Sequence, residues 1–467
     1  MGRPPPPWAD PSPLLASSPW PPIDSIHPHR FQRRQRSSPR PRAGAFVTSH
    51  SSSTSRSSST APLSPGRLRL VILALSLGAF AIGTTEFASM GLLPQIARDL
   101  AVSIPQAGML ITLYALGVVI GAPLVTIAAV RIPRARLLVL LIALIGLGNL
   151  LSAIAPDFTV LAAARFLAGL PHGAYFGVAS LVAARLSPAG RRARSVSLVM
   201  LGLTIATMLG VPASTALGQS VGWRSAYVIV VVITAATTLT IWRLVPEPEH
   251  SGATGSIRGE LRALRRIQVW FALGIGSIGF GGMFAVYSYI GEIVPGVLGL
   301  DETAVPLALF IFGVGMTVGN IVAGRLADRS IYGTIFLGLL GMALTLGVFA
   351  LVAHQAIAGM VMLFIVAVAS QLLGPSLQLF LMDASPDAPS LAAALHHSAL
   401  NIGNSLGAAL GAAVLAAGFG LLAPAWTGVV LALLGLGIAS CSYLTHRRQQ
   451  ARAEVAAQAA TEVPVAC

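Results

Sequence analysis

The sequence predicts an all-α membrane protein, with twelve transmembrane helices arranged in two six-helix bundles. Of the 467 residues, 55% are hydrophobic and only 10% are charged, and the mean hydropathy is +0.78, a composition outside the range of ordinary soluble proteins. Apolar runs long enough to span a bilayer follow one another along most of the chain, and their pattern repeats between its two halves.

Twelve apolar runs of spanning length are separated by short polar breaks. Only helices and closed barrels satisfy the backbone hydrogen bonds in lipid, and runs of this length lack the two-residue alternation of barrel strands, so we expect helices. Their approximate limits are 68–94, 105–130, 135–155, 158–184, 195–218, 225–245, 268–291, 303–324, 331–353, 356–381, 391–417 and 421–444.

The two halves of the chain carry similar segments at nearly equal spacing. Residues 117–121 read Gly-x-x-x-Gly and match residues 315–319 at an offset of 198, and residues 203–210 match residues 400–407 at an offset of 197. Small residues at this spacing also commonly pack helices together in membranes. The shared offset favours duplicated halves, an architecture typical of transporters that hold their substrate near the midplane.

The segments outside the apolar runs define the expected domain organisation. Residues 1–66 are rich in Pro, Ser and Arg, which predicts a disordered tail; an organelle transit peptide and a chain start further downstream are alternatives. The expected order is a cytoplasmic tail at 1–66, an N-terminal bundle at 67–245, a cytoplasmic linker at 246–267, a C-terminal bundle at 268–445 and a cytoplasmic tail at 446–467.

Arginine residues cluster after the second, fourth, sixth and eighth predicted helices, whereas the opposite loops carry almost only Arg98 and Arg224. By the positive-inside rule both termini are cytoplasmic, in a multi-pass protein of the plasma or bacterial inner membrane. The net charge of +14 does not indicate nucleic-acid binding, because ten Arg residues before Leu70, set against two Asp residues, supply +8 of it.

Several chemistries lack the residues they require. Cys441 and Cys467 support neither a disulfide framework nor a metal site. The chain contains no Lys, no G-x-x-x-x-G-K-[ST] phosphate loop and no H-E-x-x-H motif. We therefore expect no enzyme, no cofactor and no metal.

Glu86 places a carboxylate inside the first apolar run, in the stretch Gly83–Phe87. A carboxylate at the bilayer centre costs about 2.5 to 3.5 kcal/mol, so an intramembrane acid is a functional hypothesis. The run would place Glu86 about 8 Å from its middle, inside a hydrocarbon core of about 30 Å. The alternative is that the helix ends sooner and Glu86 lies among headgroups or in water.

Arg165 and His172 lie in the fourth predicted helix, two turns apart on nearly the same face. A buried Arg is costly without partners, so Arg165 should meet a carboxylate or carbonyl groups, and Glu86 is the expected acidic neighbour. The alternative is that Arg165 snorkels to the outer interface. His172, beside Pro171 and Gly173, fits either a hydrogen-bonded packing role or a proton relay.

His396 and His397 lie in the first turns of the eleventh predicted helix, before Asn401 and Asn404. They either line a cavity or hydrogen-bond neighbouring helices. The candidate substrate cavity comprises Thr84, Thr85, Phe87, His172, Tyr287, His397, Asn401 and Asn404.

Two further segments are candidates for conformational change. Gly210 and Pro212 lie in the fifth predicted helix, where such residues mark a kink or a close helix contact. The turn from Gly324 to Arg329 is charged, and it is either a solvated loop or a latch in which Asp328 pairs with Arg residues until transport breaks the contact.

These motifs resemble the major facilitator superfamily, specifically its twelve-helix drug:proton antiporter branch and the arabinose-efflux-permease-like and chloramphenicol-exporter group within it. The resemblance covers roughly residues 68–444. It rests on G-T-T-E-F-A-S-M-G-L-L-P at 83–94, G-A-P-L at 121–124, R-F-L-A-G at 165–169, G-V-P at 210–212, the G-W-R that ends at Arg224, and S-A-L-N-I-G-N-S-L-G at 398–407.

The resemblance implies proton-coupled export by alternating access. Glu86 resembles the acid that such exporters use for proton or cationic-substrate binding, and Arg165 resembles the helix-four arginine of the family. The family's G-x-L-A-D-R loop lacks its acid at residues 121–126 but is intact at residues 324–329, and Val211 interrupts the helix-five antiporter motif. The implied gating and antiporter residues are Gly121, Arg131, Gly210, Pro212, Gly324, Asp328 and Arg329.

The leading expectation is proton-driven efflux of a small, mostly apolar compound, such as an amphenicol, by a monomer in the lipid bilayer. Its partners would be protons and the small-molecule substrate, and no nucleic acid. Because the C-terminal half offers no equally deep charge, coupling is expected to reside in the first and fourth helices. The alternatives are export of a sugar, nucleoside or other metabolite, and a non-transporting membrane sensor or scaffold.

Overall fold

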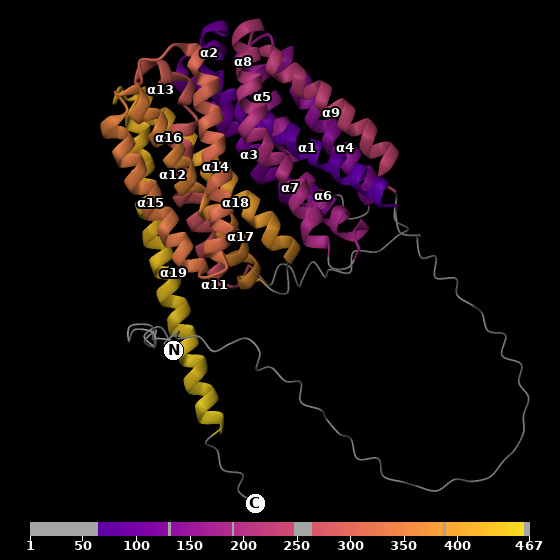
Figure 1. Ribbon diagram of the computed structural model, residues 1–467, viewed down its shortest axis with the longest axis vertical. Helices are drawn as coiled ribbons and strands as arrows, with labels where there is room; N and C mark the ends of the chain where they lie inside the picture. Colours follow the sequence, from indigo (N-terminus) through magenta and orange to yellow (C-terminus); the bar gives the residue numbers. More distant parts are fainter. Residues whose placement is uncertain (1–63, 129–131, 189–190, 247–263, 386–388, 462–467) are drawn as a thin grey trace, which may run out of the picture. The chain divides into compact units, whose positions relative to one another are not determined.

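The computed structural model describes residues 64–128, 132–188, 191–246, 264–385 and 389–461, and every regular element in these ranges is helical. The described helices belong to one compact unit, residues 60–467 (Figure 1). The expected tail at 1–66 and linker at 246–267 lie almost entirely outside the described residues.

Twelve segments are long and apolar enough to cross a membrane, which confirms the predicted fold class. The predicted limits agree with the helices to within a few residues, except that the last helix continues well past residue 444. The segments are Pro65–Gly91, Ile104–Ala122, Arg134–Ala153, Phe158–Leu186, Arg194–Val221, Arg224–Leu244, Ile267–Tyr287, Glu302–Ala327, Ile331–Val352, Ala356–Ala384, Leu395–Ala416 and Ala423–Val455.

Most of these segments are single helices. In the first half they are α1 (Pro65–Gly91), α3 (Ile104–Ala128), α4 (Arg134–Ala153) and α9 (Arg224–Leu244), with the short α2 (Leu93–Asp99) after α1. In the second half they are α14 (Val305–Ala327), α15 (Ile331–Val352), α18 (Pro389–Ala416) and α19 (Ala423–Thr461), with the 3-10 turn η4 (Glu302–Ala304) before α14.

Four segments that the sequence predicts as unbroken helices are interrupted. The fourth consists of α5 (Phe158–Gly169) and α6 (His172–Leu186), and the tenth of α16 (Ala356–Gln371) and α17 (Leu373–Ala384). The fifth consists of α7 (Arg192–Ile205), the π-helix η2 (Ala206–Gly210) and α8 (Val211–Val221). The seventh consists of α11 (Ile267–Gly274), the π-helix η3 (Ile275–Gly279) and α12 (Gly281–Tyr287), followed by α13 (Ile290–Gly296).

Proline explains two of these interruptions. Pro171 precedes α6, and Pro212 stands in the first turn of α8, directly after the π-helical turn. Proline has no N–H to donate and its ring clashes with the preceding turn, so a helix that contains it kinks or changes its winding.

The two halves repeat the same glycine-mediated helix contact. A Cβ at Gly117 of α3 would collide with the carbonyl oxygen of Phe166 in α5, and a Cβ at Gly315 of α14 would lie 2.5 Å from the carbonyl oxygen of Phe364 in α16. Gly315 and Phe364 each stand 198 positions after their counterparts, the offset predicted from sequence. Duplication and helix packing therefore both account for this motif.

The outer surface of the bundle is strongly apolar. Large side chains such as Leu73, Trp242 and Ile357 are 65%, 69% and 83% exposed. A soluble protein rarely exposes apolar surface on this scale, whereas lipid tails solvate it.

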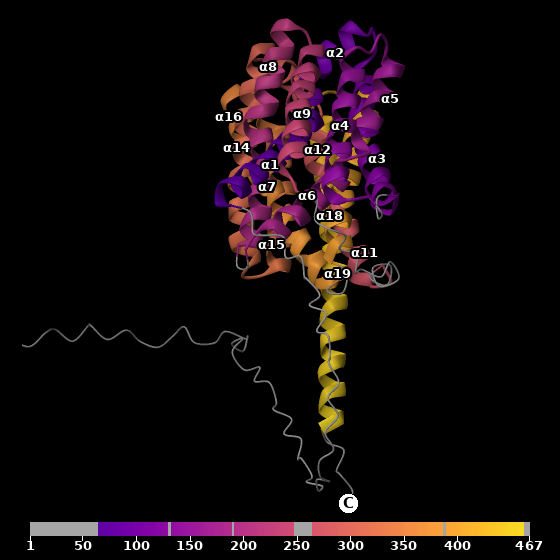
Figure 2. The same cartoon turned by 90° about the vertical axis from the view of Figure 1, so that its right-hand side faces the viewer.

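The halves meet along two main seams, α3 against α18 and α14 against α8 and η2. Both views place α2 and α8 at one end of the bundle, and α19 runs out beyond the other helices at the opposite end (Figures 1 and 2). We call these the α2 end and the α19 end.

Candidate functional site between the two halves

Glu86 lies on α1 where this helix faces the other half. Its side chain is only 6% exposed, and its Oε1 accepts a hydrogen bond of 3.4 Å from Nδ2 of Asn404 on α18. Because α1 begins and ends three residues earlier than the predicted run, Glu86 lies about 12 Å from the helix midpoint rather than about 8 Å. Protein, rather than open solvent, surrounds the carboxylate.

Arg165 is fully buried on α5, and its hydrogen bond goes to a hydroxyl instead of the expected carboxylate or carbonyl. Its Nη1 donates to Oγ1 of Thr85 at 3.1 Å, and its guanidinium lies 4.3 Å from the centre of the Tyr114 ring. Within the described ranges no ion pair of 4.0 Å or less joins Arg165 to Glu86, although the two interact electrostatically. Nε and Nη2 of Arg165 have no hydrogen-bond partner among the described groups.

Asn149 on α4 completes this arrangement, and the sequence analysis missed it. Its Oδ1 accepts a hydrogen bond of 2.5 Å from the Thr85 hydroxyl, and its Nδ2 donates to the Ile145 carbonyl at 2.8 Å. The sequence contains a signal, since Asn149 is an amide in the otherwise apolar stretch 137–151, and the structure buries it fully. The chain Asn149, Thr85 and Arg165 ties α4, α1 and α5 together beside Glu86, and we call it the Arg165 network.

His172 begins α6 and hydrogen-bonds Tyr114 of α3, with 3.0 Å between Nδ1 and the phenol oxygen. Its ring also packs against Phe176 at 5.2 Å between centroids. Phe176 in turn stacks on His397 of α18 at 5.2 Å and 12°. His172 and His397 therefore both contact one aromatic ring at the junction of the halves.

Of the two asparagines of α18, one bonds its own helix and the other bonds a neighbouring helix. Asn401 donates to the His397 carbonyl of its own helix at 3.0 Å, while Asn404 crosses to Glu86. Oδ1 of both amides is buried without a hydrogen-bond partner among the described groups. Asn404 thus joins two helices, which agrees with the expectation that such amides hydrogen-bond neighbouring helices.

Aromatic side chains pack around Phe87, the residue that follows Glu86. Phe87 lies 5.7 Å from the Tyr287 ring and 6.2 Å from the Phe284 ring, and Tyr287 stacks on Phe312 at 4.5 Å. Thr84 is buried there too, but its hydroxyl bonds the Phe80 carbonyl of its own helix. We call Phe87, Phe284, Tyr287 and Phe312 the aromatic cluster.

Gly210 and Pro212 adjoin the same part of α1. A Cβ at Gly210 would collide with the Thr84 hydroxyl and lie 2.9 Å from the Phe80 ring, so only glycine lets η2 approach α1 this closely. Gly121 has the same role on α3, because a Cβ there would collide with the backbone of Leu170. Both glycines therefore serve close helix contacts, whatever else they do.

The remaining predicted gating residues lie apart from Glu86. Arg131 falls outside the described residues. Asp328 and Arg329 are exposed at the end of α14, and a Cβ at Gly324 would meet nothing within 4 Å. In the part of the chain that the structure describes, Asp328 makes no ion pair.

The α2 end holds a set of polar contacts between the halves that the sequence did not predict. Glu302 of η4 accepts two hydrogen bonds from Arg98, at 2.9 and 3.1 Å, and one from Gln95 at 3.3 Å. Gln219 of α8 donates to the Glu302 carbonyl at 2.8 Å. Glu302 thus binds α2 and α8 of the first half.

A second ion pair at this end stays within the first half and explains the G-W-R motif. Asp99 accepts hydrogen bonds from Nη1 of Arg224 at 2.5 Å and from Nε1 of Trp223 at 2.9 Å, and Arg224 also donates to the Ala155 carbonyl. The hydrogen bond from Arg224, and then that from Trp223, hold the pKa of Asp99 below its usual value.

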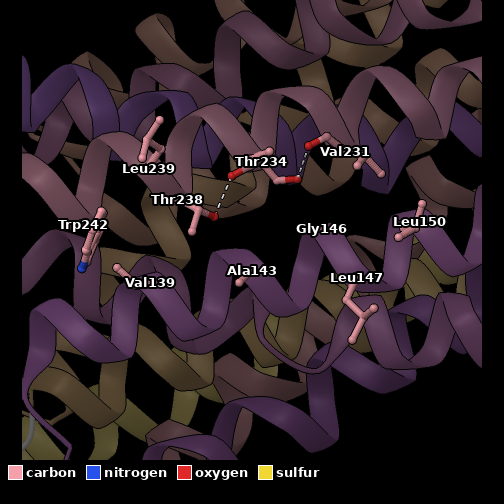
Figure 3. Close-up of a pocket in the computed structure, with 11 residues that line it drawn as sticks. Val139, Ala143, Gly146, Leu147, Leu150, Val231, Thr234, Thr238, Leu239 and Trp242 are labelled. Atoms are coloured by element: carbon pink, nitrogen blue, oxygen red, sulfur yellow. Dashed lines mark hydrogen bonds between the residues drawn. The ribbon is translucent and has the colours of Figure 1, made fainter.

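A groove of about 550 Å³ lies between α4 and α9 (Figure 3). Its lining is mainly apolar, and the hydroxyls of Thr234 and Thr238 bond carbonyls of their own helix. Leu147 and Trp242, which line it, are exposed on the lipid-facing surface. The groove contains none of the predicted site residues.

The chain matches known proteins over most of its length. A model of the Major Facilitator Superfamily matches residues 75–408 and, in a second match, 293–466. The inner membrane transport protein YdhP of Escherichia coli (strain K12) is 39% identical over 79% of this chain and 95% of its own length. A chloramphenicol resistance protein of Streptomyces lividans is 32% identical, again over 79% and 95%.

Among solved structures, a bacterial homologue of the human lysosomal transporter Spinster, inward-facing and unoccupied, superposes with a TM-score of 0.65 at 16% identity, over 82% of this chain and 98% of that one. At this identity the likeness supports the fold alone. The family model and the sequence relatives establish the rest: this chain is a membrane transporter that belongs to the Major Facilitator Superfamily.

Proposed function

We propose that this protein exports a small, mostly apolar compound in exchange for protons by alternating access. The observation that carries the proposal is the position of Glu86, a buried carboxylate on one half that is hydrogen-bonded to the other half. When this carboxylate takes up or releases a proton, its charge changes at the contact between the two halves. This is the contact that must form and break during alternating access.

The energetics favour such a coupling. A proton that moves inward releases about 2.3 kcal/mol per 100 mV of membrane potential. Protonation can shift the balance between inward-facing and outward-facing conformations only if Glu86 has a different proton affinity in each. Contacts from the opposite half provide this difference. Arg165, on the same half as Glu86, interacts electrostatically with the carboxylate.

The aromatic cluster supports a compound with a substantial apolar part, since it includes Phe87, the residue after Glu86, and Tyr287, whose ring lies 5.7 Å from the Phe87 ring. The chloramphenicol resistance relative supports an amphenicol-like drug. A hydrogen-bonding metabolite, such as a sugar or nucleoside, is the second candidate, and the unpartnered Oδ1 of Asn401 favours it.

Contacts at the α2 end support a conformation in which this end is closed. Glu302 binds Arg98 and Gln219 across the halves. The positive-inside distribution supports this as the outer end, so we propose that the protein here is open to the cytoplasm, with both termini on that side.

The test is transport in everted membrane vesicles from a host that lacks its own efflux pumps. An amphenicol and a set of sugars and nucleosides are added separately to energised vesicles, and a pH-sensitive dye reports protons that leave the lumen. We expect proton release with the transported compound, and matching resistance in intact cells. Accumulation of a compound without proton release would contradict antiport, and no response to any compound class would contradict export.

A further inference from the structure

We propose that Asn404 is the residue through which the C-terminal half responds to the protonation state of Glu86. This inference rests on the proposed proton coupling at Glu86. It adds a positioning residue on α18 to a coupling site that the sequence analysis confined to the first and fourth helices.

The contact lies at the junction of the halves. Asn404 is 1% exposed, and its Nδ2 donates to Oε1 of Glu86 at 3.4 Å, between residues 318 positions apart in the chain. The next residue, Ser405, also crosses the junction, since its hydroxyl donates to the Thr112 carbonyl of α3 at 3.4 Å. Asn404 is thus held where α18 packs against the first half.

An amide suits both protonation states of a carboxyl group. Ionised Glu86 can only accept hydrogen bonds, and the Asn404 NH₂ group supplies a donor. Protonated Glu86 has an O–H to donate, and Oδ1 of Asn404, buried and without a partner among the described groups, can accept it after the amide turns. Leucine, of similar size, would serve neither state.

The ionised and the protonated forms of Glu86 bind Asn404 with different strength. A hydrogen bond to an ionised group is roughly twice as strong as one between neutral groups, and its usual length is about 2.7 to 2.9 Å. The observed 3.4 Å leaves the bond room to tighten when Glu86 is ionised. Ionised Glu86 therefore holds α1 and α18 together, and protonation loosens this contact.

The other groups that face Glu86 do not supply this link. Arg165 and Tyr114 act on the carboxylate electrostatically, but both belong to the first half and move with it. Tyr287 of the C-terminal half also lies within electrostatic range, and its described contacts are with aromatic rings. Asn404 is the residue of the second half whose hydrogen bond to Glu86 the structure describes.

The test measures the pH response of the conformation in the full-length protein. Spin labels at Arg191 and Arg325, both exposed and one in each half, report the distance between the halves at the α19 end, with Cys441 and Cys467 replaced by Ser. In the wild type we expect the ratio of the two distance populations to change about tenfold between high and low pH, equivalent to about 1.4 kcal/mol. In Asn404→Leu this change should be lost while substrate exchange persists.

Ser405→Ala is the matched control, because it removes a neighbouring hydrogen bond across the halves without touching Glu86, and its pH response should remain. Asn404→Asp gives a second readout that does not depend on Asn404→Leu being well folded. Two adjacent carboxylates resist joint ionisation, so the midpoint of the pH response should move to higher pH.

The outcomes separate the two proposals. If Glu86→Gln keeps the pH response, the proposed coupling role of Glu86 is wrong. If Glu86→Gln loses the response but Asn404→Leu keeps it, or Asn404→Asp leaves the midpoint unchanged, only the role of Asn404 is wrong.

Discussion

Arg165 donates its hydrogen bond to Thr85, the residue immediately before Glu86, at 3.1 Å. The cation is therefore fixed beside the carboxylate without forming an ion pair of 4.0 Å or less with it in the described structure. This arrangement keeps the positive charge in place while leaving the carboxylate free to bind a proton or to bond Asn404.

The Arg165 network should be a main source of stability in the first half. Replacing Thr85 by Val removes a hydroxyl that both Arg165 and Asn149 use, and it leaves two buried polar groups unpaired. We expect a loss of about 1 to 3 kcal/mol, because a buried polar group without a partner keeps its desolvation cost. Thermal unfolding in detergent measures this loss.

Thr240→Val is the control for that experiment, since the Thr240 hydroxyl is exposed and bonds only the Ala236 carbonyl of its own helix. Equal melting temperatures for the two variants would show that the network contributes nothing.

The contacts of Glu302 should bias the conformation at the α2 end. Glu302→Gln removes the charge that Arg98 binds across the halves, so the population open at this end should rise. Because exposed ion pairs contribute about 0 to 1 kcal/mol, the open-to-closed ratio should change by no more than about fivefold. Distances between spin labels at Ser220 and Asp301 measure the ratio.

Asp99→Asn provides a matched control for Glu302→Gln. Asp99 also bonds an arginine at the α2 end, but Arg224 belongs to the same half, so the distance distribution should stay as in the wild type. A similar shift in both variants would contradict a specific role for Glu302.

The Asp99 ion pair should instead make stability depend on pH. Its pKa in the folded protein is lowered by the hydrogen bond from Arg224, then by that from Trp223. The stabilisation is therefore complete above the unfolded-state pKa of about 3.9 and is lost as the pH falls through the folded-state value. Half of this side chain is solvated, so the contribution should stay below about 1 kcal/mol.

Melting curves of the wild type and Asp99→Asn, recorded from neutral pH down to about pH 3, should converge as the pH falls. A constant difference between the two proteins over this range would contradict the assignment.

Two glycines of the predicted gating set should respond in opposite ways to alanine. A Cβ at Gly121 would collide with the Leu170 backbone, so Gly121→Ala should destabilise the protein by about 1 to 3 kcal/mol. Gly324 has open space around its Cα and lies in α14, so Gly324→Ala should be neutral or stabilising by up to about 1 kcal/mol. Melting temperatures compare the two, and a transport defect in a stable Gly324→Ala protein would indicate a gating role.

The sequence predicts the fold closely because hydropathy and length determine the spanning helices. Burial of Glu86 and Arg165 follows from their place in apolar runs. The hydrogen-bond partners of these two side chains do not follow from the sequence, because Thr85 and Asn149 meet only when α1 and α4 pack together. The contacts of Glu302 could not be predicted from the sequence either, since they join residues more than 80 positions apart in loops and helix ends.

The most direct test of the account is proton-driven transport by Glu86→Gln in proteoliposomes, with Glu454→Gln, the same substitution at an exposed site, as the control. An imposed pH gradient should drive uphill transport in the wild type and in Glu454→Gln. Glu86→Gln should retain substrate exchange at equal concentrations but lose uphill transport. Uphill transport by Glu86→Gln at the wild-type rate would contradict the proposed role of Glu86 in proton coupling.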